Sequence, residues 1–93
     1  MTNQTETPST AFILTMRYQS TTVALDEIVK HYLPHIGIAQ AKRRAAEQTL
    51  PFPTFKADKN SHKSPYLVRV ADVAAWLDKQ AADAAEDWLK VNH

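Results

Sequence analysis

A Pro-Phe-Pro segment at residues 51–53 divides the sequence into parts that must fold differently. Each proline lacks the backbone N–H that a helix interior uses, and its ring clashes with the preceding helical turn. Before this segment, apolar residues recur at the spacing of amphipathic helices, whereas the residues that follow it are rich in aromatic and β-branched types. We therefore expect helical structure to end before residue 51 and an extended segment to begin there.

Two helices joined by a short turn are predicted before the prolines. Residues 20–22, Ser-Thr-Thr, offer hydroxyls that can cap the first helix, and Pro34 ends it. Its apolar side chains recur at helical spacing, and they are Leu25, Ile28, Val29 and Tyr32. Gly37, the only glycine, stands where a tight turn would need a positive φ. The second helix covers residues 38–48, which are dense in good helix formers.

After the prolines, the pattern predicts two strands and a long helix. Residues 52–56 and 66–70 favour strands, and the polar residues 58–64 between them favour a hairpin tip. From Val73 to Trp88, apolar residues recur at helical spacing for several turns. This order predicts an α+β fold of the small winged helix-turn-helix type, with a two-stranded β-hairpin as its wing and a long C-terminal helix.

Residues 11–93 are expected to form one domain, because a second core would need roughly 50 more residues. Residues 11–18 favour a short helix with Phe12, Ile13 and Met16 on one side. Residues 1–10 are polar and show no periodicity, so they are predicted to be a disordered tail.

The chain has no cysteine, which excludes disulfides and thiolate chemistry and suits a reducing cytoplasm. No apolar run approaches the roughly 20 residues that cross a bilayer, and the first ten residues lack the basic start of a signal peptide. We therefore expect a cytoplasmic protein with no membrane partner.

Positive charge is concentrated in the middle of the chain. Between residues 38 and 69 lie seven Lys and Arg residues against two acidic ones, whereas both flanks carry net negative charge. A polyanion would be attracted to this central segment. The expected partner is double-stranded DNA.

The helix that follows the turn, residues 38–48, is the main candidate site, because a winged helix-turn-helix protein presents its recognition helix there. This helix carries Gln40, Lys42, Arg43 and Arg44. Arg can donate two hydrogen bonds to guanine, Gln can pair with adenine, and Lys is a natural phosphate contact. The hairpin adds candidates that could grip phosphates, namely Lys56, Lys59, Asn60, His62, Lys63 and Arg69. The alternative is that both segments are ordinary solvated basic surfaces.

Catalytic and metal sites are not indicated by the sequence. His31 and His35 are four residues apart, but Pro34 lies between them and no carboxylate or cysteine is suitably spaced for a metal. Ser61 and His62 are neighbours on a hairpin, where side chains rarely aim at each other. A chain with a single glycine cannot build a glycine-rich phosphate loop. We therefore predict no enzymatic activity, no metal and no cofactor.

Several motifs carry a resemblance to a known family. They are LPFPTFK at residues 50–56, SHKSPYLV at 61–68 and ADVAAWLDKQ at 71–80, together with TAFIL at 10–14 and LDEIV at 25–29. In order and spacing they resemble the pyocin activator PrtN family over roughly residues 10–85. The resemblance implies a small helix-turn-helix activator that binds promoter DNA and switches on bacteriocin or prophage-type genes, typically under control of a DNA-damage response. His62 and Trp76 stand where Gln and Tyr are usual in that family.

A surplus of apolar side chains predicts a homodimer. The expected core consists of Leu25, Ile28, Val29, Ile38, Phe52, Phe55, Leu67, Val70, Val73 and Leu77. The residues left over are expected to form the dimer interface, and they include Phe12, Met16, Ala81, Ala84, Trp88 and Leu89. A small-molecule pocket built from such apolar residues is the alternative, but no polar groups converge on them to orient a ligand.

The predicted function is therefore a dimeric, sequence-specific DNA-binding transcription activator, with RNA polymerase as a further candidate partner. The alternative function is a phage- or prophage-encoded interaction module that binds a host protein through the same fold.

Overall fold

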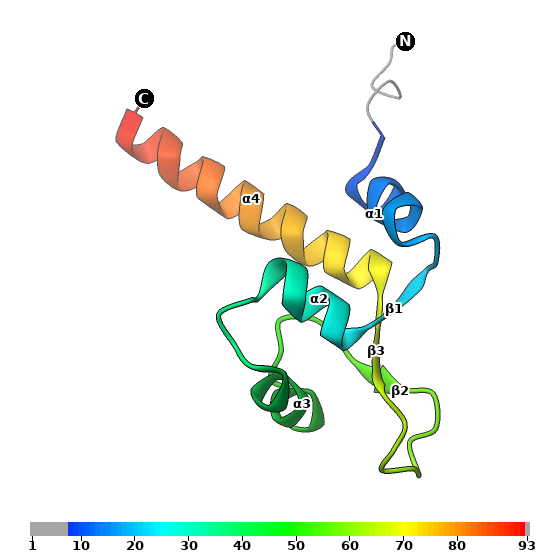
Figure 1. The fold of residues 1–93 in the computed structure, drawn as a ribbon. Coiled ribbons are helices and arrows are strands. Elements are labelled where there is room, and N and C mark those ends of the chain that lie inside the picture. The colour runs from blue at the N-terminus through cyan, green and yellow to red at the C-terminus, as the bar shows by residue number, and fades with distance from the viewer. Residues whose placement is uncertain (1–7, 93) are drawn as a thin grey trace.

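The computed structural model describes residues 8–92, which form four helices and a small sheet (Figure 1). In chain order the elements are α1 (Thr10–Tyr18), β1 (Thr22–Ala24), α2 (Leu25–Tyr32), α3 (Ile38–Ala46), β2 (Phe55–Lys56), β3 (Tyr66–Arg69) and α4 (Val70–Asn92). The α+β class, the four helices and the long C-terminal helix are confirmed. Most of the predicted tail, residues 1–7, lies outside the described residues, and Thr10 already belongs to α1, which Ser9 caps through its side chain.

The sheet has three antiparallel strands in the order β1-β3-β2, whereas the sequence predicted only two. The additional strand, β1, includes part of the segment expected to cap α2. Val23 of β1 pairs with Val68 of β3, and both side chains are buried. The Ser20 hydroxyl accepts a hydrogen bond from the Thr22 N–H and so forms a local turn, while α2 begins after Ala24 without any side-chain cap. A three-residue strand is too short to show the alternation that marks strands in sequence.

The hairpin strands are shorter than predicted. Phe52 and Thr54 are buried, but they precede β2 in an irregular segment, because Pro51 and Pro53 cannot donate to a strand ladder. The Phe52 ring packs edge-on against Trp76 of α4, with the ring centres 5.3 Å apart. The Pro-Phe-Pro segment therefore anchors the hairpin to the core instead of extending it.

The turn between α2 and α3 does not use a positive φ at Gly37, contrary to the prediction. Gly37 has a φ of −77° and is the N-cap of α3, a conformation open to any residue. The chain reverses earlier, where the Ile36 N–H donates to the Leu33 carbonyl. The short segment between Tyr32 and Ile38 nevertheless makes the expected helix-turn-helix, and the whole element order fits the winged helix-turn-helix class.

The core lies between α1, α2, α3, the sheet and the first turns of α4. Its buried residues include Leu14, Val23, Leu25, Ile28, Val29, Leu33, Ala41, Ala45, Phe52, Val68, Val70, Val73 and Ala74. Two predicted core residues are exposed: Ile38 begins α3 at the rim of the domain, and Phe55 points outward from β2. The inner face of α3 is formed by Ala41 and Ala45, as expected, and their small side chains let its backbone lie close to the core.

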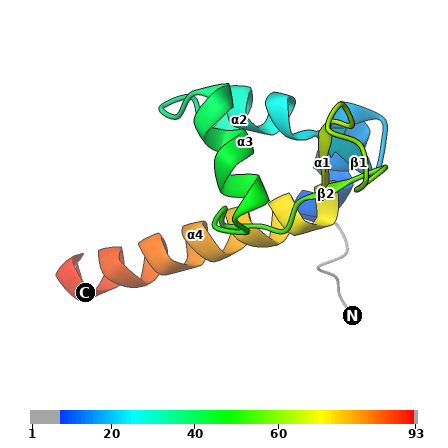
Figure 2. The ribbon, with the colours of Figure 1, turned by 90° about the horizontal axis from the view of Figure 1, so that it is seen from below.

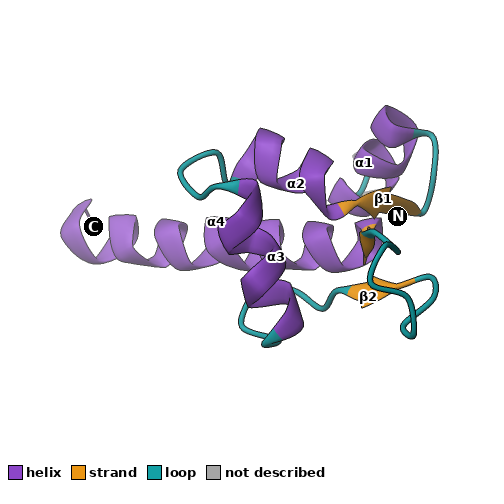
Figure 3. Ribbon diagram, turned by 60° about the horizontal axis from the view of Figure 1, so that its bottom comes forward, coloured by secondary structure: helices purple, strands orange, loops and turns teal. Residues whose placement is uncertain are grey.

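Only the first part of α4 packs on the domain. Val70, Val73 and Ala74 are buried and Leu77 is half-buried, but every residue from Asp78 to Asn92 is exposed. At 1.5 Å per residue, this 23-residue helix is about 34 Å long, and its last turns project beyond the rest of the domain (Figures 2 and 3). The exposed outer segment, residues 78–92, is about 15 residues long, and an isolated helix of that length is marginally stable in water.

Candidate nucleic-acid interface

The orientation of α3 is set by its two fully buried alanines. Ala41 and Ala45 face the core, so Gln40, Lys42 and Arg43 are exposed. These three polar side chains can reach a ligand without disturbing the packing of the helix. α3 therefore presents donors suited to base edges and phosphates on its solvent side.

Arg44, predicted beside Arg43 as a DNA contact, also makes a contact within the chain. It is half-buried, and its guanidinium donates a hydrogen bond of 2.8 Å to the Thr49 carbonyl. The Thr49 N–H in turn donates to the Arg44 carbonyl, and Gln48 has a left-handed φ of 58°. This is a Schellman-type end, in which Gln48 occupies the position that glycine usually takes. Arg44 therefore braces the turn that ends α3.

We expect Arg44→Ala to lower the free energy of unfolding by about 1 kcal/mol, because it removes this hydrogen bond. In a domain of this size the loss corresponds to a fall in Tm of about 4–8 °C. Thermal denaturation followed by circular dichroism measures it, with Arg43→Ala as the matched control. Equal Tm values for the two variants would contradict the bracing role.

The tip of the hairpin is a hydrogen-bonded loop. The Asp58 carboxylate accepts from the Asn60 N–H at 3.1 Å, and the Ser64 hydroxyl accepts from the Asp58 N–H at 3.2 Å. The Ser61 hydroxyl accepts from the Lys63 N–H at 3.1 Å. Small polar side chains thus hold the loop backbone. The exposed side chains of this tip are those of Asp58, Lys59, Asn60, His62 and Lys63.

Lys56 is half-buried at the base of the hairpin. Its ammonium lies 5.0 Å from the centre of the Tyr66 ring and donates a 3.3 Å hydrogen bond to the Ser61 carbonyl. Both contacts tie β2 to the loop and to β3. Lys56 therefore supports the wing and also adds positive charge beneath it.

The hairpin and α3 lie at the same end of the molecule (Figure 1), and a basic cleft of about 230 Å³ separates them. We call it the α3–wing cleft. Its charged and titratable lining residues are Lys42 of α3, Lys56 of β2, His62 and Lys63 of the tip, Tyr66 of β3 and Asp26 of α2. Lys59 lines a second recess, beside Ala46 and Gln48 at the C-terminal end of α3. Wing lysines therefore lie beside the middle and the C-terminal end of α3.

Arg69 is not brought together with these residues. It is exposed, pairs with Thr22 across the sheet and directly precedes α4. It therefore lies at the end of β3 that is farthest from the tip.

Comparison with known families adds an independent observation to this geometry. The family model described as pyocin activator protein PrtN matches residues 10–84. The chain belongs to this family. The match spans α1 to the middle of α4 and includes every candidate DNA-binding residue, in agreement with the resemblance seen in the sequence. No curated protein and no solved structure was found to match the chain.

The family is described as one of pyocin activator proteins, which is a family of regulators and not of enzymes. No helix within residues 8–92 is long and apolar enough to cross a membrane. The same residues contain no cluster of three side chains that could hold a metal ion.

His31 takes part in a contact between helices. Its Nδ1 lies 2.8 Å from the Tyr18 hydroxyl, and the two rings stack. Burial raises the pKa of the Tyr18 phenol, so this hydroxyl keeps its proton and can donate to His31. The pair joins the end of α1 to α2.

The residues predicted to join two copies are all at the surface of this PrtN-family chain. Phe12 and Met16 of α1 are 55% and 62% exposed, and Trp88 and Leu89 of α4 are 61% and 56% exposed. Ala81 and Ala84 are exposed on α4 as well. Trp88 and Leu89 lie beyond the residues that the family model matches.

Proposed function

We propose that this protein activates pyocin-type genes by binding a specific DNA sequence, with α3 in the major groove and the hairpin on the phosphate backbone. The observation that carries the proposal is the α3–wing cleft, in which Lys42 of α3 and Lys63 of the wing line one basic recess. A single phosphate at this recess would contact both elements at once. It would fix the position of α3 relative to the duplex.

Gln40 and Arg43 are the proposed base readers. Both are exposed on α3, three residues apart, so they lie on one face of the helix. Arg43 would donate two hydrogen bonds to guanine O6 and N7, and Gln40 would pair with adenine N6 and N7. Lys42, at the cleft, would contact the phosphate backbone.

The wing residues Lys59, Asn60, His62 and Lys63 are proposed phosphate contacts. They project from a loop whose backbone is held by its own side chains, so little conformational entropy is lost when the loop meets DNA. Lys56 would act from beneath them. Arg69 would contact DNA only where the duplex extends past the sheet.

We expect Lys59→Ala and Lys63→Ala to weaken binding to all duplexes and to reduce the slope of log K against log salt by about one each. The ratio of specific to random binding is expected to survive. Fluorescence anisotropy over a series of salt concentrations measures both quantities, with Lys90→Ala on the outer part of α4 as the control. A changed sequence preference with an unchanged slope would show that the wing reads bases instead.

The same proposal includes a two-fold dimer, because one apolar stripe runs along the whole of α4. Its members alternate at spacings of four and three residues, and they are Val70, Ala74, Leu77, Ala81, Ala84, Trp88 and Val91. The first three belong to the core or its edge, and the last four are exposed. This spacing is the seam of a coiled coil. The stripe that packs α4 on its own domain would therefore pack its outer half on a second copy.

The exposed apolar side chains of α1 are proposed to add to this interface, because α1 packs on α4. The Thr10 hydroxyl donates a 2.7 Å hydrogen bond to the Asp78 carboxylate, which sets the first turn of α1 against the middle of α4. Phe12 and Met16 then follow on α1, and Leu89 flanks the stripe on α4. An apolar patch of this kind is typical of a protein interface. Two copies would present two recognition helices to half-sites about 10 base pairs apart.

Selection of bound duplexes from a random pool, followed by a gel shift on the enriched sequence, tests the proposed function. We expect a defined sequence with two half-sites and a strong dependence of affinity on salt. A protein that enriches no sequence, or binds every duplex alike, would favour the alternative of a protein-binding module. This activity would belong to the cytoplasm, where promoter DNA and RNA polymerase are found.

A further inference from the structure

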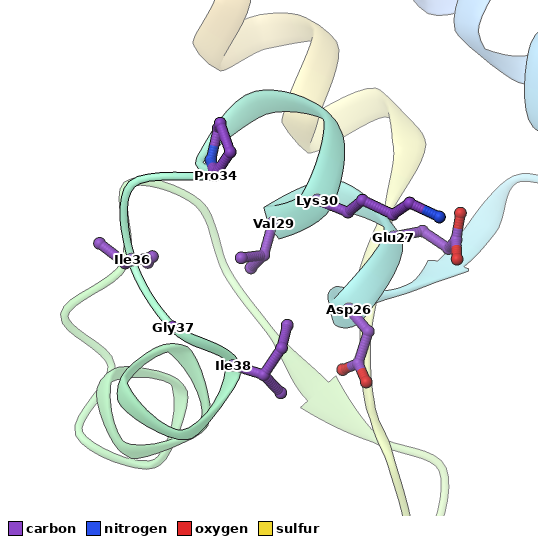
Figure 4. A pocket seen from close by; sticks show the side chains of 8 residues that line it. All are labelled: Asp26, Glu27, Val29, Lys30, Pro34, Ile36, Gly37 and Ile38. Atoms are coloured by element: carbon purple, nitrogen blue, oxygen red, sulfur yellow. The ribbon is translucent and has the colours of Figure 1, made fainter.

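A groove between α2 and α3 combines an apolar floor with an acidic rim (Figure 4). Val29, Pro34, Ile36 and Ile38 supply its apolar surface, and Asp26, Glu27 and Lys30 supply its charged rim. Val29 and Ile38 face each other across it from different helices. We call it the α2–α3 groove.

The rim of this groove is unsuited to DNA. Asp26 and Glu27 are exposed in the first turn of α2, where the helix dipole favours their negative charge. Together they would repel a phosphate placed at this rim, whereas in the α3–wing cleft Asp26 is outnumbered by three lysines. Neither carboxylate takes part in an ion pair among the described residues.

The groove is nevertheless next to the proposed DNA surface. Asp26 lines both the α2–α3 groove and the α3–wing cleft. Ile38, in the groove, and Lys42, in the cleft, are one turn apart on α3. A molecule in the groove would therefore lie alongside DNA held by the cleft, and it would itself have to carry positive charge.

The apolar part of the groove points to a protein ligand. Ile38 is 37% exposed at the start of α3, and Ile36 is half-buried in the turn. The groove is open and has a volume of about 480 Å³. An apolar floor with charges on one side fits an amphipathic helix, whose apolar side chains enter the groove while its polar face meets the rim.

We propose that the α2–α3 groove docks a basic amphipathic helix of RNA polymerase holoenzyme bound at the adjacent promoter. Lysine or arginine side chains of that helix pair with Asp26 and Glu27, and an apolar side chain packs between Val29 and Ile38. This inference rests on the proposed function, since DNA held by α3 brings the groove to the polymerase. The acidic first turn of α2 is then the activating surface of the protein.

The test separates DNA binding from activation. The variant is the full chain with Glu27→Gln, whose carboxylate lines the α2–α3 groove but not the α3–wing cleft, and the control is Glu86→Gln, which removes an exposed carboxylate from the outer part of α4. Each protein is titrated onto its selected duplex and then added to RNA polymerase holoenzyme on a promoter that carries this site. We expect the variant to bind the duplex at least as tightly as the parent but to stimulate transcription on the order of fivefold less. The control is expected to match the parent in both assays.

Three results would overturn the inference. The first is full stimulation by the variant, and the second is a parallel loss of DNA binding and stimulation, which would assign the Glu27 carboxylate to folding or to DNA. The third is a parent protein that binds its site without stimulating the polymerase. Failure of the parent to select any duplex is a different result, since it removes the proposed function itself and the inference with it. Circular dichroism of the variant checks that α2 is retained.

Discussion

Replacing Arg43 with alanine is expected to abolish most of the discrimination between the selected duplex and random DNA. Arg43 is exposed on α3, and no hydrogen bond or ion pair within the described residues engages its guanidinium. Loss of a bidentate contact to guanine costs about 1–3 kcal/mol, which is roughly a 5- to 150-fold loss of specific affinity. Affinity for random DNA is expected to fall far less, and the Tm is expected to remain that of the parent.

Arg69→Ala is the matched control for this prediction. It removes the same side chain from an exposed position on β3, away from α3 and the wing tip. We expect this variant to keep its sequence preference. Competition titrations with selected and random duplexes measure both variants side by side. If Arg43→Ala discriminates as well as the parent does, α3 does not read guanine through this residue.

Replacing Trp88 with glutamate is expected to convert the dimer into a monomer. Trp88 is 61% exposed in a single chain and lies on the apolar stripe of α4. The substitution would remove the aromatic contact from that seam. It would also place a carboxylate there, desolvated and without a partner. Truncation of such an anchor costs about 2–4 kcal/mol, so dimerisation is expected to weaken by about 30- to 1000-fold.

Sedimentation equilibrium at micromolar concentration measures this change, and Lys90→Gln is the control because it alters the charge by the same amount outside the stripe. The parent and the control are expected to sediment as dimers, and the Trp88→Glu protein as a 10.5 kDa monomer. The monomer is expected to bind a single half-site and to lose the cooperative binding of two. A parent protein that is itself a clean monomer on DNA would refute the dimer.

The helices of this fold could be predicted from the sequence because their patterns are long. α2 and α4 are each at least eight residues long, and their apolar side chains recur on one face. The Pro-Phe-Pro segment separates these two helices in the sequence. β1 could not be found in this way. Its three residues become a strand because Val23 meets Val68, a contact between distant parts of the chain. The exposure of Ile38 and Phe55 likewise depends on where α3 and β2 meet the rim of the domain.

In the candidate site, too, features set by neighbouring residues could be predicted, whereas features set by tertiary contacts could not. The charges on α3 and the hairpin are visible in the sequence, but the cleft that brings Lys42 and Lys63 together is a tertiary feature. The hydrogen bond from Arg44 to Thr49 could not be predicted, because it exists only once α3 ends in a left-handed turn. The sequence does not indicate a left-handed turn at Gln48, since glycine is the residue expected at such a position.

Specific recognition of DNA by α3 is the central claim, and a competition titration tests it most directly. A labelled duplex carrying the selected sequence is bound by the full chain and displaced by unlabelled selected or random duplex at physiological salt. We expect the selected duplex to compete at least about 10³-fold better than the random one. Equal competition by the two duplexes, with the same dependence on salt, would contradict sequence-specific binding and leave only a general attraction to polyanions.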